Sequence, residues 1–362
     1  MGAKEDFFNK MKDSKFHQKH ENLTQQIYDA LDMLPSRYVY VLTNCCNLRC
    51  DFCFQDKEPK KDTMTSEDWI NLTKQLPEYS RVTMTGGEPL VFEGFDETFD
   101  YVAKRFPCNL ITNGILLTSK KIDFLLSYPN FKVLSISIDD IGNSIRGVRS
   151  VHWDHLKEMM KYFNKRKSEL GSECVLDIKT MILDENAGDL FEIYKYLIEE
   201  LGADSHAFQF LKGSPIQHAD EMFDVEGVQT KSSAYVYVNF KEIEQQLERV
   251  RKYNIENGRA SFLHPKVASL NSEELLPSLG GINIEEHKKE TYAGCKFAWS
   301  SVHINFDGKL FPCLAIEMGD VRKNSLKEIV HGTKFKEFKE LVRREGTLEA
   351  CNRCGWLRPI EK

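Results

Sequence analysis

The feature that most constrains this chain is a group of three cysteines, Cys46, Cys50 and Cys53, with C-x3-C-x2-C spacing. The group follows an apolar run over residues 38–43 that has the composition of a strand. A [4Fe–4S] cube usually takes four thiolates, one for each iron, so three thiolates on a short loop leave one iron open. An open metal position is typical of a reactive centre. A structural zinc loop is the alternative, although zinc needs a fourth ligand close by.

The composition indicates an intracellular enzyme. With 362 residues, of which 41% are hydrophobic, the chain can bury a large core. Its net charge of −6 argues against a general nucleic-acid binder. No window reaches the length of a membrane span, and the polar start over residues 1–6 is unlike a signal peptide. The ten cysteines fall into groups typical of metal ligands, so we predict a reducing compartment and a cytoplasmic protein.

Short apolar strands alternate with helical patterns from about residue 38 to 212, which indicates βα units around a parallel sheet. The predicted strands cover residues 38–43, 81–85, 109–112, 132–139, 174–182 and 207–211. The predicted helices cover residues 66–75, 97–105, 119–127, 154–170 and 189–201. Functional groups in parallel sheets gather at the carboxyl ends of the strands. The sequence therefore predicts an α/β fold with its site at that edge.

A turn with two glycines follows the second predicted strand and reads Gly86-Gly87-Glu88-Pro89. Glycine has no Cβ, so its backbone can approach a ligand closely at a strand end. This turn resembles the GGEP motif of the radical S-adenosylmethionine (radical SAM) superfamily, and the three cysteines resemble its cluster motif. Phe52 occupies the aromatic position before the last cysteine of that motif. The chain is therefore identified as a member of this superfamily.

The resemblance implies a partial (β/α)6 barrel with S-adenosylmethionine (SAM) chelating the open iron of a [4Fe–4S] cluster. One electron, from a reductant such as flavodoxin or ferredoxin, cleaves SAM to a 5′-deoxyadenosyl radical that abstracts hydrogen from a substrate. The turn and the Glu88 side chain would hold the methionyl amino group of SAM. The other cofactor-binding residues that we expect are Thr112, Asn113, Ser137, Asp139 and Arg146.

Two of these expectations depend on a strictly alternating strand. Over residues 133–139, Ser135, Ser137 and Asp139 share one face, which should point into the barrel, while the apolar face packs outward against helices. Arg146 matches the family arginine that pairs with the carboxylate of SAM, a geometry that suits a guanidinium fork. Arg149 is a rival for this role, and an ordinary surface cation is the other reading.

Alternation also places Asp177 and Lys179 on one face of the fifth strand, inside the barrel. Buried opposite charges usually need each other or a ligand. One reading is a mutual structural ion pair. The other is a catalytic role, in which one of the two residues contacts the substrate or accepts its proton.

A second cysteine group lies near the C-terminus, where Cys295 and Cys313 are spaced C-x12-G-x4-C and are followed by Cys351 and Cys354. The group resembles the SPASM and twitch extensions of radical SAM enzymes. The full SPASM pattern supplies seven cysteines for two clusters, whereas this region offers four. Four thiolates saturate one [4Fe–4S] cluster, so we expect one auxiliary cluster without an open iron. A four-cysteine zinc site is the alternative.

We divide the chain into four parts. These are a helical lead-in over residues 1–35, the radical SAM barrel over 36–212, a substrate-selecting connector over 213–290 and a SPASM/twitch-like domain over 291–362. The connector should contain a helix near residues 240–253. The last part should contain a β-hairpin of strands 300–305 and 310–312 and a helix over 326–344.

For the reaction we expect oxidation of a small, polar, carbohydrate-like substrate or its nucleotide conjugate, with the auxiliary cluster accepting an electron. We expect neither a nucleic-acid nor a membrane partner. One alternative is a maturase that modifies ribosomal peptides. A second is an epimerase in which Cys108 or Cys174 donates a hydrogen atom. The alternative that is not an enzyme is a catalytically silent iron–sulfur scaffold or electron carrier.

Overall fold

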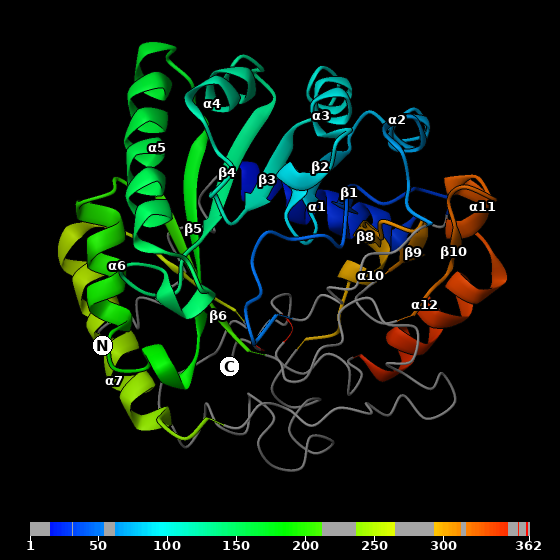
Figure 1. Cartoon of the computed structure of the whole chain (residues 1–362). Helices are drawn as coiled ribbons and strands as arrows, with labels where there is room; N and C mark the ends of the chain where they lie inside the picture. Colours follow the sequence, from blue (N-terminus) through cyan, green and yellow to red (C-terminus); the bar gives the residue numbers. More distant parts are fainter. Residues whose placement is uncertain are drawn as a thin grey trace.

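The computed structural model describes residues 15–30, 32–53, 62–211, 237–264, 293–312, 316–346, 354 and 360. Within these ranges, one curved sheet runs in the order β10-β9-β8-β1-β2-β3-β4-β5-β6-β7 (Figure 1). Its strands are β1 Arg37–Val41, β2 Arg81–Thr85, β3 Cys108–Thr112, β4 Phe131–Ser137, β5 Val175–Ile182, β6 Ser205–Phe210, β7 Phe262–His264, β8 Ser301–Ile304, β9 Lys309–Phe311 and β10 Gly319–Asp320. Neighbouring strands from β1 to β7 are parallel.

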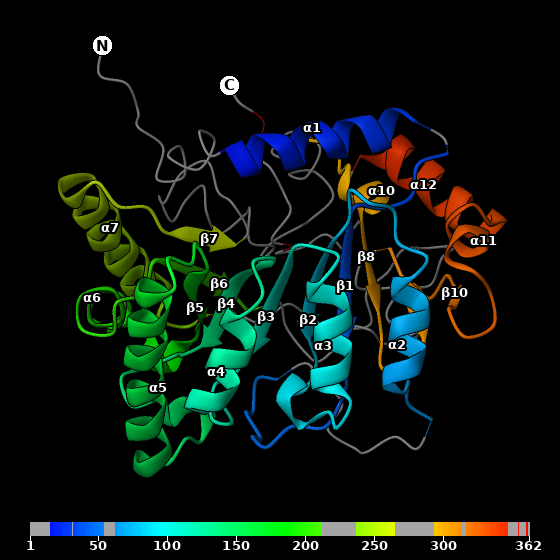
Figure 2. The same ribbon diagram turned by 90° about the horizontal axis from the view of Figure 1, so that it is seen from above.

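Helices α2 to α7 cover the convex side of the sheet, as Figures 1 and 2 show. The helices are α1 Lys15–Asp29, α2 Ser66–Thr73, α3 Phe95–Ala103, α4 Ser119–Leu126, α5 Ser150–Glu169, α6 Leu190–Glu199, α7 Phe240–Asn257, α10 Phe297–Ser300, α11 Leu326–Val330 and α12 Thr333–Glu345. The six predicted strands and the five predicted helices between them are present. The α/β class with a parallel sheet is confirmed.

The alternation predicted for β4 is also present. Leu134, Ile136 and Ile138 are fully buried in the core. Ser135, on the opposite face of the strand, donates a hydrogen bond to Asp177 of β5 at 2.8 Å. The concave face of the sheet therefore carries the polar side chains.

Two elements differ from the sequence expectations. The connector contains the predicted helix α7 and, after it, the short parallel strand β7, whose three residues are too few for a detectable period. The helix expected over residues 326–344 is divided into α11 and α12. Ser325 and Glu328 form a capping box that starts α11, and Gly332 is the N-cap of α12, so each helix has its own start signal.

The predicted C-terminal hairpin joins the main sheet. β8 pairs in parallel with β1, and β9 pairs antiparallel with β8. Cys295 precedes β8 and so lies toward the amino ends of the strands, whereas Cys46 follows β1 at the carboxyl ends. A five-residue strand is about 17 Å long, so Cys46 and Cys295 lie toward opposite ends of the sheet, separated by roughly that distance.

Within the described ranges, no helix combines the length and the apolar character that crossing a lipid bilayer requires.

We predict that Phe99→Ala strongly destabilises the fold. Phe99 is fully buried, and its ring lies 5.5–5.6 Å from the rings of Phe95, Phe124, Tyr128 and Phe131. Replacing a buried phenylalanine by alanine costs about 3–5 kcal/mol. The measurement is the urea midpoint of the purified protein. Val151→Ala, at a position with 62% exposure, should leave the midpoint nearly unchanged. Equal midpoints for the two variants would contradict the packing.

Candidate functional site

The loop after β1 carries the three cysteines of the first group, none of which forms a disulfide within the described residues. Cys50 is buried, and Cys46 and Cys53 are half-buried. The Cys46 Sγ atom accepts hydrogen bonds from the Leu48 backbone N–H at 3.4 Å and from the Asn113 amide at 3.8 Å. Burial raises the pKa of the Cys46 thiol above its usual value. Three sulfurs on one loop suit the ligand set of an iron–sulfur cluster in number and spacing. Within the described ranges, however, the structure does not bring three Cys, His, Asp or Glu side chains together closely enough to hold a metal ion.

The turn over residues 86–88 packs directly on the backbone of this cluster loop. The Gly87 N–H donates to the Thr43 carbonyl at 2.6 Å, and the Glu88 N–H donates to the Cys45 carbonyl at 2.8 Å. A Cβ on Gly86 would lie 2.6 Å from the Thr43 oxygen, and one on Gly87 would lie 2.3 Å from the Cys45 oxygen. Both glycines are therefore needed for the close approach of the turn to the loop.

The Glu88 side chain joins this turn to the end of β3. Glu88 is fully buried, and its carboxylate accepts hydrogen bonds from the Thr112 hydroxyl at 2.7 Å and the Asn113 N–H at 2.8 Å. The Leu90 N–H is a third donor, at 3.1 Å. Burial raises the pKa of Glu88 to about 7, although the three donors favour the ionised form.

Asn113 extends the same connection to the cluster loop. Its amide nitrogen donates to the Asn47 side-chain oxygen at 2.7 Å, in addition to the contact with the Cys46 sulfur. The predicted residues Glu88, Thr112 and Asn113 thus meet around the cluster loop. The sequence did not indicate Asn47 as part of this group, because its neighbours in space come from strands far along the chain.

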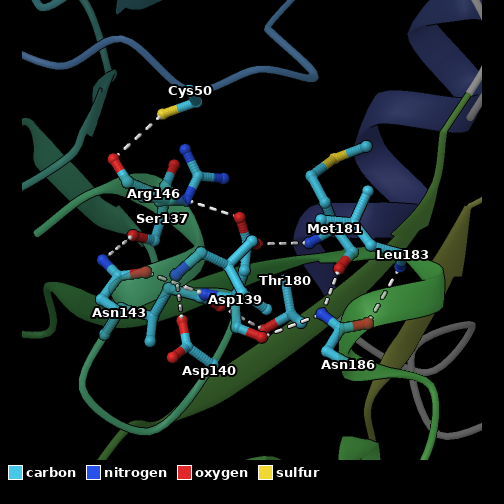
Figure 3. Close-up of polar contacts among 12 residues, drawn as sticks. Cys50, Ser137, Asp139, Asp140, Asn143, Arg146, Thr180, Met181, Leu183 and Asn186 are labelled. Carbon is cyan, nitrogen blue, oxygen red and sulfur yellow. Dashed lines mark hydrogen bonds and ion pairs between the residues drawn. The ribbon is translucent and has the colours of Figure 1, made fainter.

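A second polar group lies at the ends of β4 and β5 (Figure 3). The Arg146 Nε atom forms an ion pair with the Asp139 carboxylate at 2.7 Å, and the other oxygen of Asp139 accepts from the Met181 N–H at 2.7 Å. The Arg146 guanidinium lies 5.2 Å from the centre of the Phe52 ring. The Cys50 thiol donates to the Arg146 carbonyl at 3.7 Å. Arg146 therefore lies beside the cluster loop.

The Asp139 side chain has no exposed surface. Burial raises the pKa of Asp139, while the Arg146 charge and the Met181 N–H oppose the rise. In Figure 3 the Arg146 guanidinium lies between Cys50 and Asp139, and its Nε atom pairs with the Asp139 carboxylate. Its position over the Phe52 ring keeps the guanidinium at the cluster loop.

Two asparagines hold the backbone around this ion pair, and the sequence analysis missed both. Asn143 has a left-handed backbone with φ of 54°, and its side chain accepts from the Asp139 N–H and donates to the Ser137 carbonyl, both at 3.1 Å. Asn186 donates to the Asp139 carbonyl at 2.8 Å and to the Met181 carbonyl at 2.8 Å. Asparagine tolerates the left-handed region, but no periodic pattern reveals such loop contacts.

Arg149, the rival of Arg146, is exposed at the N-cap of α5, where it contacts the His152 Nε2 atom at 3.0 Å. Ser137 is half-buried at the end of β4 and contributes its carbonyl to Asn143.

Asp177 and Lys179 form the mutual ion pair that was one of the two readings, with a separation of 3.0 Å. The Asp177 carboxylate also accepts from the Ser135 hydroxyl at 2.8 Å and the Ser205 hydroxyl at 2.6 Å. Burial alone would raise the pKa of Asp177, but Lys179 and the two serines together hold it below its usual value. Asp177 is therefore poorly suited to accept a proton, whereas the Lys179 side chain keeps 37% of its surface exposed.

The second cysteine group is described in part. Cys295 and Cys354 are half-buried and form no disulfide with another described residue, while Cys313 and Cys351 lie outside the described residues. The Cys295 N–H donates to the Gly346 carbonyl at 2.9 Å. Because Gly346 ends α12, this bond brings Cys295 beside the point where the chain turns toward the last two cysteines.

We predict that Glu88→Gln lowers stability by about 1–3 kcal/mol, because an amide nitrogen would then face a buried donor. All three partners of the Glu88 carboxylate are donors, so either orientation of the glutamine leaves at least one of them unpaired. The measurement is urea unfolding of the iron-free protein. Glu93→Gln, at an exposed position five residues later, is the matched control. Equal stability of the two variants would show that the Glu88 contacts contribute little.

The chain matches two family models. Residues 40–197 match the Radical SAM superfamily, and residues 295–355 match SPASM, an iron-sulfur cluster-binding domain. Both confirm the resemblance found in the sequence. The match to SPASM includes all four cysteines of the second group, two of which lie outside the described residues.

Several curated proteins are similar in sequence. The sporulation killing factor maturation protein SkfB of Bacillus subtilis is 28% identical over 51% of this chain and 43% of its own length. The antilisterial bacteriocin subtilosin biosynthesis protein AlbA of the same organism is 28% identical over 31% of this chain and 26% of its own length. A probable GTP 3′,8-cyclase of Methanopyrus kandleri is 24% identical over 85% of this chain and 89% of its own length. The chain thus spans less than half of SkfB and AlbA.

Solved structures share the fold. Streptococcus suis SuiB bound to S-adenosylmethionine superimposes with a TM-score of 0.63 at 17% identity and covers 94% of this chain and 75% of that chain. Native anSMEcpe with bound AdoMet gives 0.59 at 18% identity and covers 89% of this chain and 88% of that chain. Together with the cysteine loop, the Gly86–Glu88 turn and both family models, these findings place the chain in the radical SAM superfamily, as an enzyme with a SPASM domain, [4Fe–4S] clusters and SAM as its cofactors.

Proposed function

We propose that this radical SAM enzyme modifies a peptide. One observation supports the radical SAM chemistry: the glycine turn of residues 86–88 packs on the loop that holds the three thiols. When bound, the cluster and SAM supply a carbon-centred radical that abstracts hydrogen from the substrate. The assignment of a peptide substrate is supported by the relatives SkfB and AlbA. These proteins are named for maturation of a killing factor and biosynthesis of a bacteriocin.

Three cysteines hold the SAM-binding cluster in this proposal, namely Cys46, Cys50 and Cys53. The turn would present backbone groups to the methionyl amino group of SAM from the same edge, and Phe52 lies beneath the Arg146 guanidinium on the same loop as the cysteines. Glu88 fixes the turn rather than titrating during the reaction, because its carboxylate already holds three protein donors. Thr112 and Asn113 keep the cluster loop at the end of β3.

Arg146 binds the carboxylate of SAM in this proposal. Its Nε atom is anchored by Asp139, so the outer side of the guanidinium is available for a carboxylate. Asp139 then acts as a positioning residue, and Ser137 lies at the same strand end. Arg149 is a weaker candidate, because it lies at the start of α5 and contacts His152.

Lys179 is the residue of the interior pair that faces the substrate. Its ammonium is partly exposed on the concave face of the sheet, while Asp177 beneath it is engaged by two serine hydroxyls. A fixed ammonium can hold a carbonyl or carboxylate of a peptide. We therefore assign Lys179 to substrate binding and Asp177 to positioning Lys179, in place of a proton-accepting role for Asp177.

The four cysteines of the SPASM region hold an auxiliary cluster in this proposal, namely Cys295, Cys313, Cys351 and Cys354. Cys295 lies toward the amino ends of the strands, away from the first loop. The carbohydrate-like substrate and the dehydrogenase-like oxidation that we expected find no support among these relatives.

A nucleotide substrate is the second candidate. It is favoured by the probable GTP 3′,8-cyclase, whose similarity extends over 85% of this chain, whereas SkfB matches 51%. The epimerase alternative is less favourable. Cys108 starts β3 and Cys174 precedes β5, and both are buried at the amino ends of their strands, opposite the first cluster loop.

We predict that Arg146→Ala weakens SAM binding by roughly ten- to a hundredfold, the equivalent of about 1.5–3 kcal/mol for a lost charge-assisted pair. Equilibrium binding of SAM to the reconstituted protein measures this change. Arg149→Ala, three residues later in the same loop, should bind SAM as the unmodified protein does. A loss of affinity in Arg149→Ala alone would move the role to that residue.

The proposed function is tested by incubating reduced, reconstituted protein with SAM and synthetic peptides made from any short reading frames beside its gene, and with GTP in a parallel reaction. We expect 5′-deoxyadenosine and a peptide of altered mass. The variant with alanine at Cys46, Cys50 and Cys53 should give neither product and should retain roughly half of the iron. Consumption of GTP without any change in peptide mass would favour the nucleotide candidate. Absence of 5′-deoxyadenosine in every reaction would refute the radical chemistry.

A further inference from the structure

Helix α1 lies at the amino ends of the strands, next to α10 and α12 (Figure 2). It is far from the first cluster loop, and the proposed function gives it no role. Its buried side chains Thr24 and Ile27 show that one face of the helix is packed. Several of the residues that it touches follow Cys295 directly in the sequence, and another lies on α12.

Two hydrogen bonds join α1 to the segment after Cys295, and a third joins that segment to the start of β1. The Lys296 ammonium donates to the Gln25 side-chain oxygen at 2.5 Å. The Thr24 hydroxyl donates to the Ser300 hydroxyl at 3.1 Å, and both residues are buried. The Ser300 carbonyl in turn accepts from the Ser36 N–H, at the start of β1, at 3.0 Å. The segment after Cys295 is thus fixed between α1 and the amino end of β1.

A further contact between α1 and this segment is an aromatic pair, and a cation from α12 packs against both of its rings. The rings of Tyr28 and Trp299 meet edge to face with 4.7 Å between centroids. The Arg343 guanidinium lies 4.8 Å from the centre of the Tyr28 ring and 5.3 Å from that of Trp299. Arg343 also donates to the Tyr28 carbonyl at 3.2 Å. We name Tyr28, Trp299 and Arg343 the α1 clamp.

Two residues of the clamp lie close in sequence to Cys295 or to its backbone partner Gly346. Trp299 is four residues after Cys295, and Arg343 is three residues before Gly346, whose carbonyl accepts the Cys295 N–H. The two backbones approach closely here, since a Cβ on Gly294 would lie 3.7 Å from the Gly346 Cα. Holding Trp299 and Arg343 together therefore holds Cys295 against the end of α12.

We propose that α1 is a positioning element for the auxiliary cluster and that the α1 clamp fixes the ligand Cys295. This inference depends on the proposed role of Cys295 as an auxiliary-cluster ligand. A thiolate on a chain held from two sides stays in place when its iron bond opens, so the cluster reforms instead of losing iron. Tyr28 acts through its ring, because its polar contact with Arg343 is made by the backbone.

The experiment measures loss of iron to excess EDTA in the full chain with alanine at Cys46, Cys50 and Cys53, where the remaining iron belongs to the auxiliary cluster. We expect Tyr28→Leu and Arg343→Met to lose iron about two- to tenfold faster, in line with the loss of an aromatic pair or a cation–π contact. Tyr28→Phe keeps the ring and should restore the original rate. Arg344→Met, at the adjacent exposed position, is the matched control.

A second readout needs no metal. In the iron-free protein with its native cysteines, alkylation of Cys295 followed by peptide mass spectrometry should be faster in Arg343→Met, with labelling of Cys53 unchanged. Unchanged iron loss and unchanged Cys295 labelling in both Tyr28→Leu and Arg343→Met would overturn the proposal. Equal acceleration at Cys53 would also overturn it, because the effect would then be general unfolding. If the variant with alanine at Cys46, Cys50 and Cys53 bound no iron, Cys295 would not be a ligand of an auxiliary cluster and the proposal would fail. The SAM chemistry would not be affected by this result, because the peptide and nucleotide products of the unmodified protein test it separately.

Discussion

The backbone contact between the turn of residues 86–88 and the loop after β1 is the constraint on which the first site depends. β1 and β2 are parallel neighbours, so their following segments leave the sheet at the same edge. Two hydrogen bonds join these segments, and any side chain at Gly86 or Gly87 would overlap carbonyl oxygens of the loop. Glu88 then continues the connection to β3. The ends of three consecutive strands are thereby joined around the thiols, before any cofactor binds.

At the other end of the sheet, the C-terminal elements are also positioned by the pairing of neighbouring strands. β8 pairs with β1, so Cys46 lies beyond the carboxyl end of β1 and Cys295 lies near the level of its amino end. The distance between these two cysteines is therefore set by strand length rather than by loop conformation. The α1 clamp acts at the amino ends of the strands. There the Cys295 N–H donates to the Gly346 carbonyl at the end of α12.

Much of this arrangement could be predicted from the sequence, because strands, helices and cysteine motifs are local patterns. The alternation in β4 and β5 gave the correct faces of Ser135 and Asp177, but their hydrogen bond also depends on the register between the strands. The contacts of Asn143 and Asn186 were missed for the same reason, since each joins segments that are distant in sequence or lie in irregular loops. β7 was missed because three residues carry no period.

The polar interior repeats one arrangement twice. In the pairs Asp139–Arg146 and Asp177–Lys179, the carboxylate is almost fully buried, with side-chain exposures of 0% and 10%, while the cations keep 13% and 37%. Burying a carboxylate is costly, and hydrogen-bond donors in addition to the paired cation offset this cost. The donor is the Met181 N–H for Asp139, and the donors are two serine hydroxyls for Asp177. The anions thereby fix where the cations stand. A ligand with a carboxylate would meet two positive groups whose geometry is already set, and it would have little side-chain entropy left to remove on binding.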